Sequence, residues 1–285
     1  GDEANSRYVT WVNGEEETPC WLDYHAIGSS DTLSIAAKPQ VCHSRAGKTA
    51  FYSASLENLE NGVDYCYRVR AVSDSTEWYR FHFQDSIDYS FLFFGDIQED
   101  EDAGFDTLFP AAVRQNSDVQ FILFGGDLIE RPTDHYWRIT HQMLDSVKKN
   151  YPILSVTGNH EYLKGIERTL EERFPLTFKY FQKNMEEYGG NALYTFTQGD
   201  VRFYFLDSNR DFWHLFQQRT WLKEQLEKST QKWNVVVLHH PLHSVRGRFR
   251  NLMQRLFFDG VIEDYKVDLV LQGHEHVYAR FDVTS

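Results

Sequence analysis

The sequence contains little cysteine and no long apolar run. Its three cysteines, Cys20, Cys42 and Cys66, allow one disulfide plus a free thiol or, equally well, three reduced thiols. They lack the Cys-x-x-Cys spacing of a zinc site, so we expect no zinc there. No stretch approaches the roughly 18 consecutive apolar residues of a membrane-spanning helix, so no membrane span is expected.

The sequence also lacks net positive charge. It has 29 lysines and arginines against 42 aspartates and glutamates, which gives a formal net charge of −13. An acidic chain does not provide the positive field that attracts long nucleic acids or anionic membrane surfaces. These two classes of partner are therefore not expected.

The remaining composition is that of a soluble globular protein long enough for two domains. The 285 residues are 41% hydrophobic and 16% aromatic, so a sizeable core can be buried. Residues 1–86 consist of short alternating runs separated by turn-forming residues, which predicts an all-β sandwich. The strands expected there are Tyr8–Val12, Thr32–Ala36, Thr49–Ser53, Asp64–Val72 and Trp78–Phe83.

In residues 87–285, apolar strands alternate with helical stretches. This alternation predicts an α/β domain whose sheet is covered by helices on both faces. The turn Gln198-Gly199-Asp200 predicts a hairpin, so we expect a mixed sheet. The expected strands are Tyr89–Phe94, Val119–Phe124, Tyr151–Val156, Leu193–Thr197, Val201–Leu206, Asn234–Leu238 and Val267–Leu271. The expected helices are Phe105–Gln115, Asp134–Lys149, Phe216–Lys228 and Phe249–Tyr265.

Five of these strands end in the same way, with glycine or a small turn followed by side chains that can bind a metal. Ligands of open α/β sheets bind at the carboxyl ends of the strands, so these side chains are expected at one edge. Each motif alone is typical of an ordinary turn, but five in series favour a shared site. The five segments are Gly95-Asp96, Gly125-Gly126-Asp127, Gly158-Asn159-His160-Glu161, His239-His240-Pro241 and Gly273-His274-Glu275-His276.

The order of these segments resembles the calcineurin-like metallophosphoesterase superfamily, and most closely its purple acid phosphatase branch. Val277-Tyr278-Ala279-Arg280 is similar to the branch's tail after the last segment, and 59–69 is similar to the hallmark strand of its N-terminal domain. The resemblance implies a fibronectin type III-like sandwich over residues 1–86. It further implies a metallophosphoesterase domain over 87–285, with mixed sheets packed as a β-sandwich and flanked by helices.

The resemblance also implies two metal ions, of Mn, Zn or Fe, and a role for each residue. A bridging carboxylate can hold two divalent ions roughly 3.5–4 Å apart, at which they clamp the attacking and leaving oxygens of a phosphate ester. His160 is the implied general acid or phosphate contact, with Glu161 orienting it. The implied metal ligands are Asp96 and His276 for the first ion, Asp127 for both, and Asn159, His239 and His274 for the second.

Two positions depart from the family pattern around the first metal. Purple acid phosphatases have a tyrosine three residues after the bridging aspartate, and its bond to ferric iron gives the colour; Glu130 stands there. The broader superfamily has a histidine two residues after the first aspartate, where Gln98 stands. Glu130 can substitute as a carboxylate ligand for a hard divalent ion, and Gln98 can coordinate weakly through its carbonyl oxygen. Equally, the first site can be poorly occupied; either way, no purple charge-transfer band is expected.

The leading hypothesis is a hydrolase of small phosphate esters, with monoesters favoured. A metal-bridged hydroxide would attack phosphorus, His160 would protonate the leaving group, and Asn159 would help bind the phosphate. His243 is a candidate substrate contact, and His240 is expected to orient its loop. The alternatives are a phosphodiesterase acting on small or nucleotide diesters, and a catalytically degenerate member that binds a phosphorylated or carbohydrate ligand.

The resemblance implies export, to the periplasm, the cell surface or the outside. The polar start at residues 1–6 fits a removed signal peptide. The chain ends nine residues after His276, where relatives usually continue with further strands. The sequence does not specify an oligomeric state.

Overall fold

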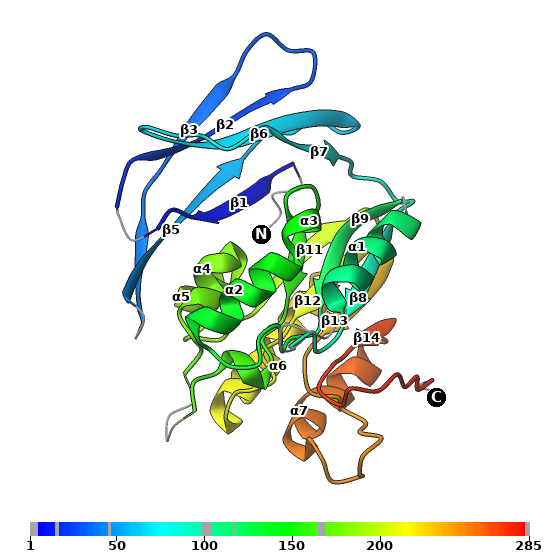
Figure 1. The fold of residues 1–285 in the computed structure, drawn as a ribbon. Helices are drawn as coiled ribbons and strands as arrows, with labels where there is room; N and C mark the ends of the chain where they lie inside the picture. Colours follow the sequence, from blue (N-terminus) through cyan, green and yellow to red (C-terminus); the bar gives the residue numbers. More distant parts are fainter. Residues whose placement is uncertain are drawn as a thin grey trace.

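The computed structural model describes residues 5–14, 17–44, 47–98, 104–116, 118–164 and 169–282, apart from the side chain of Lys183. The first four residues of the polar start lie outside these ranges. An all-β part, formed by the first seven strands, sits on a larger α/β part that carries the remaining strands and all helices (Figure 1). Within the described ranges, no helix is long and apolar enough to cross a membrane.

The N-terminal part is a sandwich of two antiparallel sheets, as predicted. One sheet has the order β1-β5-β4, and the other has the order β3-β2-β6-β7. Apolar side chains from both sheets, including Leu22 and Leu56, meet in one buried cluster. All three cysteines are unpaired. The strands are β1 (Arg7–Val12), β2 (Cys20–Ala26), β3 (Leu33–Ala37), β4 (Gln40–Ser44), β5 (Gly47–Leu56), β6 (Val63–Ala71) and β7 (Tyr79–Phe83), of which β2 and β4 were not predicted.

The α/β part contains two sheets packed face to face. The first is parallel, in the order β10-β9-β8, and the second has the order β11-β12-β13-β14, with β11 antiparallel to its neighbour. Phe121 of the first sheet meets Phe196 and Phe203 of the second edge to face, with ring centroids 5.3 and 5.6 Å apart. The strands are β8 (Ser90–Phe94), β9 (Val119–Phe124), β10 (Ile153–Ser155), β11 (Tyr194–Gln198), β12 (Val201–Phe205), β13 (Trp233–Val237) and β14 (Leu269–Leu271).

The prediction of one sheet with helices on both faces was therefore wrong, because each sheet covers the inner face of the other. The packed mixed sheets that the resemblance implied are confirmed. The hairpin is also confirmed: β11 ends at Gln198, Gly199 has φ 53°, and β12 begins at Val201.

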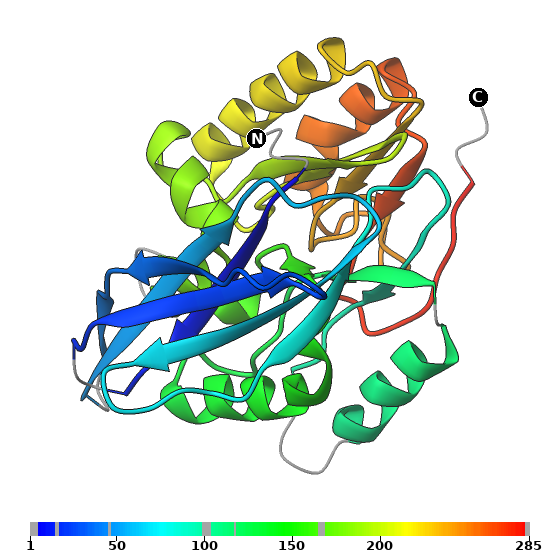
Figure 2. The same cartoon turned by 90° about the horizontal axis from the view of Figure 1, so that it is seen from above.

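Helices cover the outer faces of this two-sheet core. Figure 2 shows α6 and α7, in yellow and orange, on one side of the strands, and α1 and α2, in green, on the opposite side. The described helices are α1 (Phe105–Gln115), α2 (Asp134–Met143), α3 (Asp145–Lys148), a 3-10 turn η1 (Asn159–Glu161), α4 (Arg173–Thr177), α5 (Lys179–Glu187), α6 (Phe212–Glu227) and α7 (Leu252–Asp264).

Several helix predictions needed correction. The single helix expected over 134–149 is divided at Leu144 into α2 and α3. Helix α6 begins four residues earlier than expected because the Asp211 carboxylate accepts hydrogen bonds from the backbone N–H groups of Trp213 and His214, which caps the helix. The short helices α4 and α5 were not predicted.

Candidate metal centre

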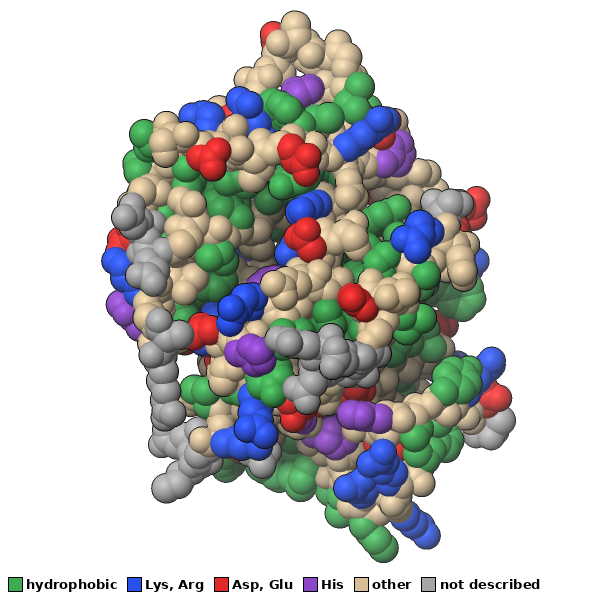
Figure 3. Space-filling model, viewed as in Figure 1, with side chains coloured by type: hydrophobic (Ala, Val, Ile, Leu, Met, Phe, Trp, Pro, Cys, Tyr) green, Lys and Arg blue, Asp and Glu red, His purple; other side chains and the backbone are tan. Residues whose placement is uncertain are grey.

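Four predicted metal ligands adopt a left-handed backbone conformation at the strand ends. The φ angles are 46° at Asp96, 51° at Asp127, 76° at His274 and 49° at His276. Such angles are uncommon outside glycine and cost free energy, so they persist only where the surrounding structure fixes them. Several histidines, with cationic and acidic side chains beside them, gather on the lower half of the face in Figure 3, below the sandwich.

Three loops bring together the ligands expected for the second metal. We call Asn159, His239 and His274 the second half-site. The Nε2 atom of His239 lies 3.1 Å from Asp127 Oδ2, 3.2 Å from Asn159 Oδ1 and 3.2 Å from His274 Nδ1. One ligand atom each from Asp127, His239 and His274 falls within 4.8 Å of the others, which is compact enough for one ion.

The orientation of His239 is fixed from its other side. Its Nδ1–H donates to the Gly125 carbonyl oxygen at 2.8 Å, so Nε2 faces the other ligand atoms. Burial alone would lower the pKa of His239, but the hydrogen bond to Asp127 raises it above its ordinary value. In His274, burial and the neighbouring His239 lower the pKa to about 4. The Asp127 carboxylate thus favours positive charge at this position, which a proton on His239 or a bound metal cation can supply.

The first half-site, which we define as Asp96, Gln98 and His276, is more open. The Asp96 carboxylate accepts the backbone N–H of His274 at 2.8 and 2.7 Å, and His276 Nε2 lies 3.8 Å from Asp96 Oδ1. The His276 side chain is 55% exposed. Burial raises the pKa of Asp96, since an ionised carboxylate is disfavoured away from water.

Asp127 lies between the two half-sites. Its Oδ1 accepts the backbone N–H of His160 at 2.8 Å, and its Oδ2 faces His239 of the second half-site and Gln98 of the first, 3.4 Å from Gln98 Nε2. Burial alone would raise the pKa of Asp127, but the contacts with His239 and His160 lower it, so the carboxylate stays ionised. This is the position that a bridging ligand requires.

The described contacts of Glu161 go to backbone N–H groups and not to the ring of His160, so its expected role in orienting that ring stays a prediction. The buried Glu161 carboxylate accepts the backbone N–H groups of Asp127, Leu128 and Gly158 at 3.0, 2.6 and 2.6 Å. Glu161 therefore connects the loop after β9, which contains Asp127, to the loop after β10, which contains Gly158. Burial and the nearby Asp127 raise the pKa of Glu161 to about 8, although the N–H groups of Gly158 and Leu128 oppose this shift.

These loops pack so closely that Gly158 cannot carry a side chain. A Cβ atom there would lie 2.0 Å from Asp127 Oδ1. The glycine of this strand-end motif thus allows the Asn159–Glu161 turn to approach Asp127.

The ring of His160 is oriented by the backbone of Glu130. Its Nδ1–H donates to the Glu130 carbonyl oxygen at 2.6 Å, and its Nε2 faces the centre, 3.9 Å from Asp127 Oδ2. The Glu130 carboxylate lies 3.6 Å from His160 Nδ1. The role of Glu130 as a ligand of the first metal therefore stays a prediction, with its described contacts directed to His160.

The polar contact described for His243 is with Asp259 and not with either half-site. Its Nε2 is 2.9 Å from Asp259 Oδ1, and its side chain is 49% exposed. Its contact with substrate stays a prediction. His240 contacts Ser208 through Nδ1 at 2.9 Å, which agrees with its expected role in fixing the loop.

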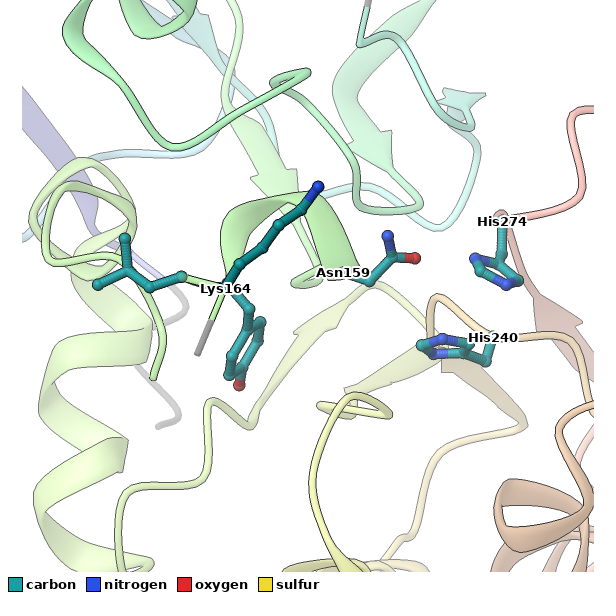
Figure 4. Close-up of a pocket in the computed structure, with 6 residues that line it drawn as sticks. Asn159, Lys164, His240 and His274 are labelled. Atoms are coloured by element: carbon teal, nitrogen blue, oxygen red, sulfur yellow. The ribbon is translucent and has the colours of Figure 1, made fainter. Parts of the chain in front are cut away.

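An open pocket of about 280 Å³ adjoins the second half-site. In Figure 4 the Asn159 amide points toward His274 and His240, and Lys164 lies on the other side of Asn159. Tyr162 and Lys164 also line the pocket and were not predicted from the sequence. Tyr162 follows Glu161 directly and Lys164 lies three residues after it, and this proximity to the motif was the available signal.

A sixth strand end supports this pocket and was also missed. After β12, Asp207 accepts a hydrogen bond from the Tyr162 hydroxyl, and Asn209 Nδ2 donates to the Thr157 carbonyl oxygen at 2.8 Å. The signal was a polar Asp-Ser-Asn run immediately after an apolar strand, as at the other five strand ends.

The donor set fits a pair of divalent transition-metal ions. Carboxylates, imidazoles and amide oxygens suit Mn, Zn or Fe, and none of the donors is a thiolate. Ligand atoms of Asp127, His239 and His274 lie within 4.8 Å of one another, and among the described residues no lysine or arginine forms an ion pair with Asp127. The residues present therefore fit a bound metal.

Comparisons with known proteins match both parts of the chain. The Calcineurin-like phosphoesterase model matches residues 89–278, and the Purple acid Phosphatase, N-terminal domain model matches residues 1–83. A phosphoenolpyruvate phosphatase of Allium cepa is 24% identical, with 94% of this chain and 60% of that protein covered. Purple acid phosphatase 1 of Ipomoea batatas is 26% identical, with 82% and 52% covered.

Among solved structures, purple acid phosphatase PPD1 from yellow lupin (Lupinus luteus) seeds superposes with a TM-score of 0.75 at 17% identity. The match covers 97% of this chain and 57% of that one, and at this identity it shows a shared fold. The chain thus spans less than two thirds of the length of these relatives. Because the phosphoesterase model matches most of its residues, the chain belongs to the calcineurin-like phosphoesterase family, with a purple acid phosphatase N-terminal domain ahead of the phosphoesterase domain.

Proposed function

We propose that this chain is a binuclear metal-dependent hydrolase of small phosphate esters and that it prefers monoesters. The observation that carries the proposal is the position of Asp127, whose Oδ2 atom faces donor atoms of both half-sites. The names of its relatives, among them a phosphoenolpyruvate phosphatase, support a monoester substrate.

Within such a hydrolase, this chain's residues position the substrate and move a proton. The two ions, when bound, supply positive charge that activates water and stabilises the charge that develops on the phosphate. Asn159 and Lys164 line the pocket and offer an amide and an ammonium group to phosphate oxygens. The carbonyl oxygen of Glu130 holds His160 Nδ1, so Nε2 faces the centre, where it can protonate the departing alkoxide.

The test combines elemental analysis with turnover of two substrates. The purified chain should hold two metal ions and hydrolyse p-nitrophenyl phosphate faster than bis(p-nitrophenyl) phosphate. Faster turnover of the diester would favour the phosphodiesterase. No metal, and no turnover of either ester after addition of Mn, Zn or Fe, would identify a catalytically silent binder. A visible absorption band typical of an iron–tyrosinate would contradict the ligand set described above.

We further propose that the domain boundary lies between residues 86 and 87, that the sandwich is fibronectin type III-like, and that the protein is exported. The boundary is supported by the end of β7 at Phe83 and the start of β8 at Ser90. Limited proteolysis that cuts first inside either part, rather than between them, would contradict it. Recovery of the native protein only from the cytoplasm would contradict export.

A further inference from the structure

Gln98 carries a buried polar atom that has no partner. The residue lies two positions after Asp96, and its side chain is 7% exposed. Its backbone N–H donates to the Asp127 carbonyl oxygen at 3.0 Å, which holds it against the loop of the bridging ligand. The side-chain oxygen Oε1 is buried and has no hydrogen-bond partner among the described residues. An unsatisfied buried oxygen is costly, so its retention needs an explanation.

The amide nitrogen of Gln98 occupies a position suited to a metal ligand. Its Nε2 lies 3.4 Å from Asp127 Oδ2 and 3.3 Å from His276 Nε2. Two donors bound to one octahedral ion at about 2.1 Å, at a right angle, are about 3.0 Å apart. The distances from the Gln98 amide nitrogen to these two atoms are thus close to the distance between two ligand atoms of one cation.

The two ends of the amide exchange places by a half-turn about the last side-chain bond. Without a cation, the amino end faces the Asp127 carboxylate because it can donate a hydrogen bond. With a cation between these groups, the oxygen is the favoured end, since it is a ligand and the amino group is not. The same half-turn gives the oxygen a partner and moves the amino group to the position that the oxygen leaves.

The other departure from the family pattern, Glu130, is less well placed. Its carboxylate faces the His160 ring, 3.6 Å from Nδ1, and no described contact joins it to Asp96 or His276. Of the two unusual residues, Gln98 is the one in contact with ligands of the first metal.

We propose that Gln98 Oε1 is a ligand of the first metal ion, together with Asp96, Asp127 and His276, and that this donor set selects a divalent ion. This inference rests on the binuclear centre proposed above. The neutral amide adds no negative charge, so only Asp96 and the shared Asp127 carboxylate offset the charge of the first ion, which favours a divalent over a trivalent ion. Oxygen donors with one imidazole suit Mn²⁺ or Mg²⁺ and provide no anionic phenolate for Fe³⁺.

The experiment is a Mn²⁺ titration of the full chain after chelation, by calorimetry and by electron paramagnetic resonance. Wild type should bind two ions and give the signal of a coupled pair. Gln98→Leu, which keeps the bulk and removes the donor, should weaken one of the two sites by at least about 10-fold, the lower range for loss of a supporting group around a metal. The coupled signal should then give way to that of a single Mn²⁺ at sub-saturating metal.

Matched variants separate this role from a structural one. Gln98→Glu and Gln98→His restore a donor and should retain both ions. Glu130→Gln should leave the stoichiometry at two. Thermal unfolding of the metal-free proteins provides the folding control. Gln98→Leu removes both the unsatisfied oxygen and the long amide contacts with Asp127 and His276, so its melting temperature should stay close to that of wild type, and only the metal-induced rise should shrink.

Three results would overturn the inference. Gln98→Leu could bind two ions as tightly as wild type, Glu130→Gln could be the variant that loses one, or wild type could bind a single ion. If the wild type binds one ion or none, the proposed binuclear function fails as well. Two ions in the wild type with an unaffected Gln98→Leu variant would overturn the role of Gln98 alone.

Discussion

Two aspartates, one in each part of the molecule, are almost completely buried but have different partners. Asp23, on β2 of the sandwich, is 3% exposed, and Asp127, at the end of β9, is 1% exposed. The Asp23 carboxylate binds Arg70 at 2.9 and 3.1 Å and Arg68 at 3.2 Å, and it accepts the Ser34 hydroxyl at 2.7 Å. Asp127 has instead histidines, a backbone N–H group and the Gln98 amide.

The difference lies in the permanence of the neighbouring charge. An arginine is always protonated, so two of them satisfy Asp23 without any further ion. A histidine balances Asp127 only while it carries a proton, and the same nitrogen can bind a metal once the proton leaves. A buried carboxylate surrounded by arginines is thus a structural ion pair, and one surrounded by histidines remains available to a metal.

The substitution Asp127→Asn should have the largest effect of those that distinguish the two aspartates, on both metal content and turnover. Loss of the bridging charge should remove metal from both half-sites and lower turnover by at least about 10³-fold, or roughly 4 kcal/mol of activation free energy. Elemental analysis and p-nitrophenyl phosphate kinetics measure both effects. Asp23→Asn is the matched control and should retain its metal; equal metal loss in the two variants would contradict the distinction.

The substitution His160→Ala should have the next largest effect. It should lower turnover and leave the metal content unchanged. Removal of a general acid typically costs about 10²–10⁴-fold. His160 is not among the residues grouped as one metal site, so the variant should still contain two ions. Loss of metal from this variant would show that His160 acts as a ligand instead.

Asp23→Asn should lower stability without lowering activity. Hydrogen bonds to charged groups are each worth about 1.5–3 kcal/mol, and the two guanidinium groups are partly solvated, so we expect a loss of about 1–2 kcal/mol. Urea unfolding measures it. Asp64→Asn, which breaks the exposed pair with Arg80, should produce no measurable change. A similar loss in both variants would show that burial of Asp23 is not the cause.

The smallest expected effect is the loss of the stability contribution of Asp23 at low pH. Hydrogen bonds from Arg70 lower the pKa of Asp23 to about 2, below the value of about 3.9 in an unfolded chain. The folded state therefore binds this proton less readily, and the contribution of Asp23 is complete above about pH 4 and is lost as the pH falls through about 2.

This pH dependence is measured on metal-free protein, so that release of metal does not contribute. The stability difference between wild type and Asp23→Asn should shrink as the pH falls from 5 to 2. A difference that is constant over this range would show that the charge of Asp23 does not contribute to stability.

The same pair shows what the sequence can predict. Asp127 was identified because its signal is local: an apolar strand, two glycines and a carboxylate. Asp23 was missed, together with its strand, because its partners Arg68 and Arg70 are more than forty residues away, on β6. A buried aspartate inside Cys20–Ala26 also breaks the alternation that identifies strands.

Other misses have equally specific causes. Hydrophobic periodicity shows that a strand is covered, but not whether a helix or a second sheet covers it, so the two packed sheets could not be derived from alternation alone. Helix α4 has only five residues and contains Pro175, which leaves no periodic signal. The contacts of Glu161 with backbone N–H groups depend on how two loops meet in space, which no local pattern specifies.

The short strand β14 gives the metal centre a second consequence, in local stability. Only three residues of β14 pair with β13, yet the loop that follows carries His274 and His276, one for each half-site. Ions that bind only when this loop is docked oppose its local opening. Bound metals would thus hold β14 and its loop in the folded position. Chelation would then speed amide hydrogen exchange in β14 before it speeds exchange in the aromatic core.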